Sequence, residues 1–266
     1  MPSLAAAQDA ISVARPRRFE AIVTRDPALV RAAQKLRYRV FVEEMGAVIH
    51  TPHYGLDWDE IDDHCDHLIV IDNQTGAIVG TTRLLNDRQA KRLGRYYSEG
   101  EFGLEGVLGL EGRFLEIGRT CVDRNVRGGA VLTCLWGVLA DYAAAGGYDY
   151  LMGCASIPAG PSGFAVEAVY QQLAAEQLGP ASLNVQPRLP VPEDMRCQRD
   201  ECGIPPLLKT YLRLGAWICG EPCWDPDFKV MDLFVLLPLS RMQARYERHY
   251  LSQRANEPGG TIAALA

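Results

Sequence analysis

The chain has 266 residues, 48% of them hydrophobic, with a formal net charge of -6 and a pI of about 5.4. This length allows one large domain or two small ones with a substantial core. The acidic balance argues against nucleic acid as a partner. The apolar run around Leu233–Leu237 is too short to cross a bilayer, and Leu4–Ala7 lacks the basic region that precedes a signal peptide. We therefore expect a cytoplasmic protein.

The N-terminal part predicts a tail, an edge strand and a helix. Residues 1–18 are alanine-rich and then basic, which predicts a mobile tail with peripheral contact to an anionic membrane as a further expectation. Phe19–Thr24 has the pattern of an edge strand. Asp26 and Pro27 predict a helix start, because Asp caps free backbone N–H groups and Pro suits the first turn. The long loop 45–66 that follows is typical of a functional lid.

A hairpin and a basic stretch come next. Strands at 68–71 and 78–85 flank the turn 72–76. Residues 86–95 are strongly basic within an acidic protein. Such a run is commonly a solvated face, but here it also suggests a surface for an acidic partner.

Residues 114–156 hold the clearest pattern of the chain. Phe114–Val122 reads as a buried strand, 131–145 has the three- and four-residue spacing of a helix, and 148–156 reads as a second strand. Gly146 and Gly147 end the helix. This order predicts a right-handed parallel crossover. The turn before the helix includes Arg124, Arg127, Gly128 and Gly129. A phosphate could bind there, because the helix N-terminus attracts anions and glycine lets a ligand approach the backbone closely. An ordinary turn between strand and helix fits the pattern equally well.

The C-terminal half predicts helices at 164–178, 205–214 and 241–250, and strands at 216–219 and 230–237. We therefore expect one domain over residues 19–251, followed by a disordered tail at 252–266.

Two clusters offer residues that bind metals elsewhere. Cys197, Cys202, Cys219 and Cys223 lack the tight CxxC spacing of a zinc ribbon. The run Asp62–His67 combines carboxylates and imidazoles, but it also suits a loop before a strand. We expect no bound metal and treat a metal-dependent hydrolase as an alternative.

These elements together resemble the GCN5-related N-acetyltransferase fold, an α/β fold with a mixed twisted sheet flanked by helices. The sequence most resembles the acyl-carrier-protein-dependent branch, the L-ornithine N-alpha-acyltransferases of bacterial ornithine-lipid synthesis. The resemblance covers roughly residues 19–251. It is carried by LRYRVFVEEMGA, DEIDDHCDHLIV, VGTTRLL, LEIGRTCVDRNVRGG and PPLLKTYLRLGAWICGEPCWDPDFKVMDLFVLL.

A more distant similarity is to the acyl-homoserine-lactone synthases. Their pattern falls on Arg37, Phe41, Asp59, Asp62, Arg83, Glu116 and Arg119. That family has a tryptophan after the first helix, and Ala47 stands at about this position here. Its absence argues against lactone synthesis. The acetyltransferase phosphate signature is also weakened, because Asn125 stands in its first position. A carrier-protein enzyme tolerates this, since phosphopantetheine bears one phosphate.

The resemblance implies transfer of a long-chain 3-hydroxyacyl group from the phosphopantetheine of acyl-carrier protein to the α-amine of ornithine, with no permanently bound cofactor. Glu116 is the candidate base, or else a structural partner of Arg119. Arg37 or Arg83 would clamp the substrate carboxylate, and Asp59 and Asp62 the distal ammonium. The acidic carrier protein would dock on Arg88, Lys91, Arg92, Arg95, Arg124 and Arg127. A different amine or a coenzyme A donor, and a non-catalytic acyl-binding module, are the alternatives.

Overall fold

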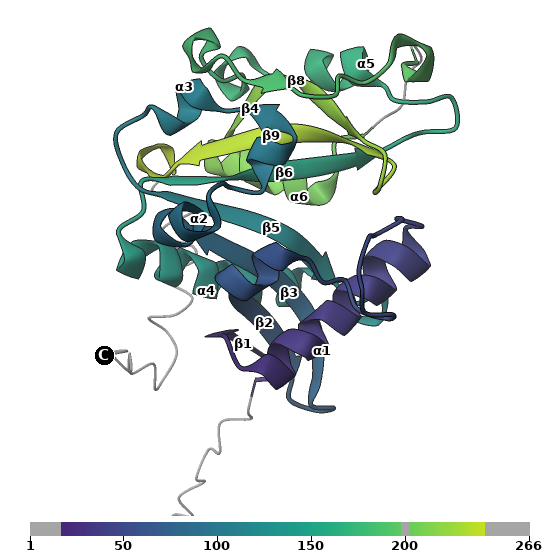
Figure 1. The fold of residues 1–266 in the computed structure, drawn as a ribbon, viewed down its shortest axis with the longest axis vertical. Helices are drawn as coiled ribbons and strands as arrows, with labels where there is room; N and C mark the ends of the chain where they lie inside the picture. Colours follow the sequence, from purple (N-terminus) through teal and green to yellow (C-terminus); the bar gives the residue numbers. More distant parts are fainter. Residues whose placement is uncertain (1–16, 198–202, 243–266) are drawn as a thin grey trace, which may run out of the picture.

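The computed structural model describes residues 17–197 and 203–242 (Figure 1). A seven-stranded sheet in the order β1-β2-β3-β5-β6-β9-β8 forms the centre of the molecule. Helices cover both of its faces, so the predicted mixed sheet flanked by helices is confirmed (Figure 1).

The first strands and helix follow the prediction closely. β1 (Phe19–Thr24) is an edge strand, and Asp26 caps α1 (Pro27–Tyr38) by accepting hydrogen bonds from the backbone N–H groups of residues 28 and 29. α1 continues into a π-helical turn, Arg39–Glu44. β2 (Asp66–Asp72) and β3 (Ala77–Asn86) form the predicted antiparallel hairpin.

α1 and α4 (Gly129–Gly146) lie on opposite faces of this part of the sheet. Alternate residues of β2 separate the two layers, because successive side chains of a strand point to opposite faces. Leu68 packs in the cluster that contains the α4 residues Val131 and Leu135. Ile69 packs with Leu36 of α1.

The predicted parallel crossover is confirmed. β5 (Phe114–Val122) leads through α4 into β6 (Tyr150–Pro158), and Gly147, in the left-handed conformation, ends α4. The two strands pair in parallel only from Phe114 to Glu116. Beyond Glu116 they diverge, and a cavity lies between them.

By length and composition, α4 is the one helix within residues 17–197 and 203–242 that is apolar enough to cross a membrane. The sequence analysis considered only the apolar run Leu233–Leu237 as a membrane span. It overlooked α4, because Thr133 and Asp141 interrupt the apolar residues of this helix. In this fold one face of α4 packs against the sheet, with Val131 and Leu139 fully buried.

The remaining elements complete the second half of the sheet. They are α2 (Asp87–Leu93), β4 (Phe102–Gly103), α3 (Glu105–Leu108), α5 (Val166–Gln171), β7 (Gln186–Pro187), α6 (Pro206–Leu214), β8 (Trp217–Asp225) and β9 (Val230–Pro238). The helix expected over 164–178 is shorter than predicted. After α5 the N–H groups of Gln172 and Leu173 bond to the carbonyls of Val169 and Tyr170 in tighter turns, and Gly179 then pairs with the carbonyl of Ile218 in β8. Residues 1–16 and 243–266, which include most of both predicted tails and the terminal helix, lie outside the described residues.

Candidate functional site

Two adjoining cavities, the inner and the outer lobe, lie beside β5. The inner lobe measures about 300 Å³ and runs between the diverging strands, with Phe41 on one face of the sheet and Leu208 and Tyr211 of α6 on the other. The outer lobe measures about 390 Å³ and lies under the loop that carries Asp57 and Asp59. Five residues line both lobes: Tyr97, Glu101, Arg119, Asp225 and Phe228. Two ligands could therefore meet at this junction.

A bulge in β5 aims Arg119 at the junction. Thr81 of β3 pairs with Cys121 and Arg83 pairs with Gly118, so β5 has one extra residue here. Arg119 lies in this bulge. Its φ is 53°, a left-handed conformation that is rare for non-glycine residues. Its guanidinium packs over the rings of Phe228 and Tyr97, at 4.6 and 5.0 Å from the ring centres.

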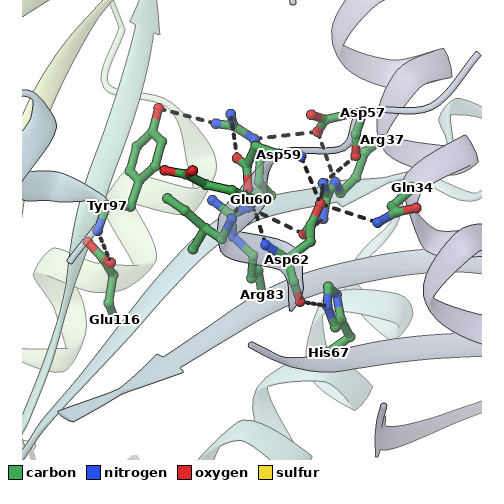
Figure 2. Close-up of polar contacts among 12 residues, drawn as sticks. Gln34, Arg37, Asp57, Asp59, Glu60, Asp62, His67, Arg83, Tyr97 and Glu116 are labelled. Carbon is green, nitrogen blue, oxygen red and sulfur yellow. Dashed lines mark hydrogen bonds and ion pairs between the residues drawn. The ribbon is translucent and has the colours of Figure 1, made fainter. Parts of the chain in front are cut away.

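Arginines and aspartates form a cluster that contacts Arg119; Figure 2 shows its members Arg37, Asp57, Asp59, Asp62 and Arg83. Arg37 binds Asp62 through two nitrogens at 2.7 and 2.8 Å and Asp57 at 2.9 Å. Arg83 binds Asp59 at 2.6 Å and Asp62 at 3.3 Å. Arg119 adds contacts of 3.4 and 3.5 Å to Asp57 and Asp59, so three positive charges face three negative ones.

This cluster separates the predicted substrate ligands into two groups. Phe41, Asp59 and Arg119 line the cavity. The side chains of Arg37, Asp62 and Arg83 are no more than 3% exposed. Asp62 forms ion pairs with both arginines. Burial alone would raise the pKa of Asp62, but Arg37 and Arg83 outweigh it and hold this pKa well below its ordinary value. The buried group fixes the loop that carries Asp57 and Asp59.

Glu116 is buried and its carboxylate is fully engaged. It accepts a hydrogen bond from the N–H of Tyr97 at 2.7 Å (Figure 2). It also accepts bonds from the N–H of Ser98 at 2.8 Å and from Ser98 Oγ at 2.5 Å. Burial raises its pKa despite these bonds. Glu116 thus holds Tyr97 under Arg119, whereas the partners of Arg119 are Asp57, Asp59 and Tyr97.

The structure adds three carboxylates that the sequence analysis did not single out. Glu101, Asp225 and Asp232 approach one another at the junction, with carboxylate oxygens within 4.8 Å. Burial raises the pKa of Glu101 to about 7, with hydrogen bonds from Cys154 and Tyr97 partly opposing it. Burial and the neighbouring Glu101 raise the pKa of Asp232 well above its ordinary value. A lone aspartate inside the apolar strand 230–237 was the signal available in the sequence.

The basic residues expected to form one docking surface fall into two groups. Arg88, Lys91 and Arg92 are exposed on α2, beside the start of β5, since Asn86 pairs opposite Leu115. Arg124 and Arg127 follow the other end of β5, where Val122 pairs opposite Gly80. A nine-residue strand, roughly 30 Å long, separates the groups. Arg95 belongs to neither, because it lines the outer lobe near Glu60.

The turn after β5 lies next to the inner lobe, which Val122 and Arg127 line. Gly128 precedes α4 without a side-chain cap, and Gly128 and Gly129 are both exposed. The first N–H groups of α4 therefore remain available for an anion. Arg127 reaches from this turn into the inner lobe, where it also pairs with Glu44 at 2.5 Å.

The two clusters weighed as metal sites have other partners. Asp66 binds Arg25, Gln89 and the hydroxyl of Tyr142, while His67 faces the carbonyl of Asp62. Cys202 lies outside the described residues, so the cysteine set is incomplete.

Comparison with known proteins agrees with this geometry. The model of the acetyltransferase (GNAT) domain matches residues 36–137. A structure of BjaI, described as a CoA-dependent acyl-homoserine lactone synthase, with MTA, shares the fold at a TM-score of 0.54 and 15% identity, covering 91% of this chain and 90% of BjaI. The fold and the cavity between diverging parallel strands therefore define an acyltransferase of the GNAT class.

Curated relatives narrow this class. The L-ornithine N(alpha)-acyltransferase of Rhodobacter capsulatus is 34% identical over 255 residues, which are 89% of this chain and 96% of the relative. Its counterpart from Rhizobium meliloti is 33% identical over 249 residues, covering 87% of this chain and 84% of the relative. The chain belongs to the L-ornithine N(alpha)-acyltransferase family.

Proposed function

We propose that the protein transfers a long-chain 3-hydroxyacyl group from acyl-carrier protein to the α-amine of L-ornithine, forming lyso-ornithine lipid. The similarity to curated relatives of that name along nearly the whole chain carries this proposal. The reaction exchanges a thioester C–S bond for an amide C–N bond, which requires two substrates to meet at one point. The junction of the two lobes suits this requirement.

The inner lobe is the proposed donor site. It extends from Arg127, beside the free N-terminus of α4, to Cys154 and Ser156 in β6. An acyl-phosphopantetheine arm would place its phosphate at the turn and its thioester between the strands. Backbone N–H groups of β5 beyond Glu116 have left the parallel ladder with β6, so they can stabilise the tetrahedral oxyanion.

The outer lobe is the proposed acceptor site. Its lining carries Asp59, Asp225 and Asp227 together with Arg95 and Arg188. Ornithine has two ammonium groups and one carboxylate, so a lining of both charge signs complements it. We propose that Asp59 contacts the distal ammonium, while Arg37, Asp62 and Arg83 hold the loop in place from below.

The deciding experiment offers purified protein a set of amines and two donors. Ornithine, lysine, glutamine and homoserine analogues are each combined with 3-hydroxyacyl carrier protein or the matching coenzyme A thioester, and products are identified by mass spectrometry. N-acyl-ornithine from the carrier-protein donor is the expected product. Preference for another amine would change the proposed acceptor, and equal use of coenzyme A would remove the proposed donor.

Charge reversal tests the two basic groups separately as carrier-protein contacts. We expect Arg124→Glu to raise the KM for acyl-carrier protein while leaving the KM for a small acyl-pantetheine donor near its original value. A triple reversal of Arg88, Lys91 and Arg92 tests α2 in the same way. Reversal of Arg31 and Lys35, exposed on α1, is the control at basic residues outside both groups. If all three variants behave alike, neither predicted group is a docking surface.

We also propose that the protein works in the cytoplasm with peripheral membrane contact. The loop beside the cavity exposes Met45, Val48 and Tyr54, whose exposed fractions are 47%, 52% and 98%. Exposed apolar side chains next to a site that makes a lipid suit contact with a bilayer. Vesicle flotation of the wild type and a Met45→Ser, Val48→Ser variant tests this contact.

A further inference from the structure

We infer that Glu101 and Asp232 act together as the general base that deprotonates the acceptor amine. The identity of that amine rests on the proposed function. The inference assigns to this pair the role expected of Glu116 from the sequence, and it depends on where the two carboxylates lie.

The pair occupies the point where the two lobes join. Glu101 follows the 3₁₀ helix Ser98–Gly100 and lines both lobes, while Asp232 comes from β9 and lines the inner lobe. Ser156 in β6 donates its hydroxyl to Asp232 Oδ1 at 2.7 Å and fixes that carboxylate. An amine entering through the outer lobe would therefore reach the pair just before it reaches a thioester between β5 and β6.

One oxygen of the pair is left without a hydrogen bond. Glu101 Oε2 is shielded from solvent and finds no donor within the described part of the chain. A buried acceptor without a donor is costly, and such atoms are uncommon in folded proteins. An ammonium N–H at the junction would satisfy it.

Repulsion between the two carboxylates favours a proton on one of them. Two carboxylates this close in a buried site cannot both ionise readily, so the pair holds one proton and a single negative charge. The pKa of Glu101, raised to about 7, suits a base that works near neutral pH. The charged and titratable groups facing the pair in the described part of the chain are Arg119 from β5, Tyr97, Cys154 from β6, and Cys223 and Asp225 from β8.

Glu116 differs in its surroundings. Its carboxylate already accepts three hydrogen bonds from Tyr97 and Ser98. The residues that line the two lobes include its neighbours Ile117 and Arg119 but leave Glu116 behind the strand. Glu116 therefore positions Tyr97, and the ring of Tyr97 in turn positions Arg119.

The proton balance of the reaction follows from this arrangement. The pair takes one proton from the ammonium, and the neutral amine attacks the thioester carbon to form the C–N bond. Collapse of the tetrahedral intermediate breaks the C–S bond, and the pair returns its proton to the leaving thiolate. The pair then takes the second proton from nitrogen and releases it to solvent. One proton is released for each amide formed.

The test compares Glu101→Gln and Asp232→Asn with Glu116→Gln, using Glu105→Gln, an exposed position on α3, as the control. Loss of a general base costs about 10²- to 10⁴-fold in rate. We expect a fall of this size in kcat for the first two variants, with the affinity for a non-hydrolysable acyl-pantetheine unchanged. Retention of kcat within about threefold in both variants would overturn the inference.

A second acceptor separates base catalysis from a structural effect. Ornithinamide has an α-amine with a pKa near that of a peptide N-terminus, about 7.7–8.0, so much of it is neutral at pH 8 without a base. We expect it to restore transfer by Glu101→Gln and Asp232→Asn at pH 8 far more than ornithine does. Equal defects with both acceptors would contradict the inference. If the wild type prefers another amine, the proposed acceptor fails, and the variants are compared on that amine and its amide form.

Two readouts are independent of turnover. Carbon-13 NMR of labelled carboxyl groups should show a signal that titrates near pH 7 in the wild type and disappears in Glu101→Gln. Titration of both carboxyls near pH 4 would overturn the inference.

Metal analysis of the purified protein tests whether a divalent cation binds these carboxylates. A stoichiometric divalent cation, with activity lost to a chelator and restored by the metal, would make these carboxylates metal ligands instead of a base.

Discussion

Arg119 Nε lies 3.4 Å from Asp57 Oδ2, the same oxygen that Arg37 Nε binds at 2.9 Å. One carboxylate therefore joins the arginine that faces the cavity to the arginine that is fully buried. The buried cluster and the cavity wall form one connected unit, so the loop 57–62 cannot shift without moving a group at the junction. The predictions below test the parts of this unit.

Arg37→Met should destabilise the protein strongly. It leaves Asp57 and Asp62 buried with fewer positive partners, and breaking a buried ion pair from one side costs about 3–5 kcal/mol. Urea unfolding measures the loss. Arg31→Met removes an exposed arginine from the same helix and should change stability by about 0.5 kcal/mol or less. Similar values for both variants would show that the cluster contributes little.

Acid should weaken the wild type partly through Asp62. Its pKa is lowered in the folded protein, so the folded state binds this proton less readily than the unfolded state. The stabilisation is fully present above the unfolded pKa of about 3.9 and is lost as the pH falls below it toward the folded pKa. Asp62→Asn should be less stable at pH 7 and should lose less stability between pH 4 and pH 2. Identical acid slopes would contradict this.

Glu101→Gln should stabilise the protein at neutral pH while it removes activity. The raised pKa means that the folded state holds a proton that the unfolded state releases near pH 4.3, so the group's contribution to stability falls between about pH 4 and pH 7. The neutral amide avoids this loss, and we expect a gain on the order of 1–3 kcal/mol at pH 8 that vanishes near pH 4. Thermal unfolding across this range measures it. A variant less stable than the wild type at every pH would refute the explanation.

Gly153→Ala should disturb the point where β5 and β6 part. A Cβ at residue 153 would lie 2.3 Å from the carbonyl oxygen of Ile117, too close for the strands to keep their positions. We expect a loss of about 1–3 kcal/mol and weaker binding of acyl-pantetheine. Gly137→Ala in α4 is the matched control, since its Cβ meets nothing within 4 Å and alanine favours a helix by about 1 kcal/mol. Unchanged stability and donor affinity in Gly153→Ala would contradict the prediction.

Local patterns predicted the elements well where they had clear ends. Asp26 capped α1 and Gly147 ended α4 as expected, because capping and left-handed glycine act through neighbouring residues. The helix at 164–178 was predicted too long: it ends at Gln171, and the segment after it pairs with a distant strand through Gly179 and Ile218. Pattern spacing contains no information on such contacts.

The site was predictable only in part. The sequence indicated that Arg37, Asp62 and Arg83 belong together, and the structure brings them together. Whether they contact a substrate or one another depends on burial, which the linear order does not determine. Glu101 and Asp232 stand 131 positions apart, so only the fold could reveal them as neighbours.

The two lobes have a consequence for the order of chemical events. Donor and amine can be bound at once, and burial raises the pKa of each thiol that lines the lobes in the described part of the chain, Cys121, Cys154 and Cys223. A protonated thiol is a weak nucleophile, so no acyl-cysteine should form between the two half-reactions. Double-reciprocal plots at varied concentrations of both substrates should therefore intersect instead of running parallel. The acyl chain should pass from sulfur to nitrogen in a single ternary complex.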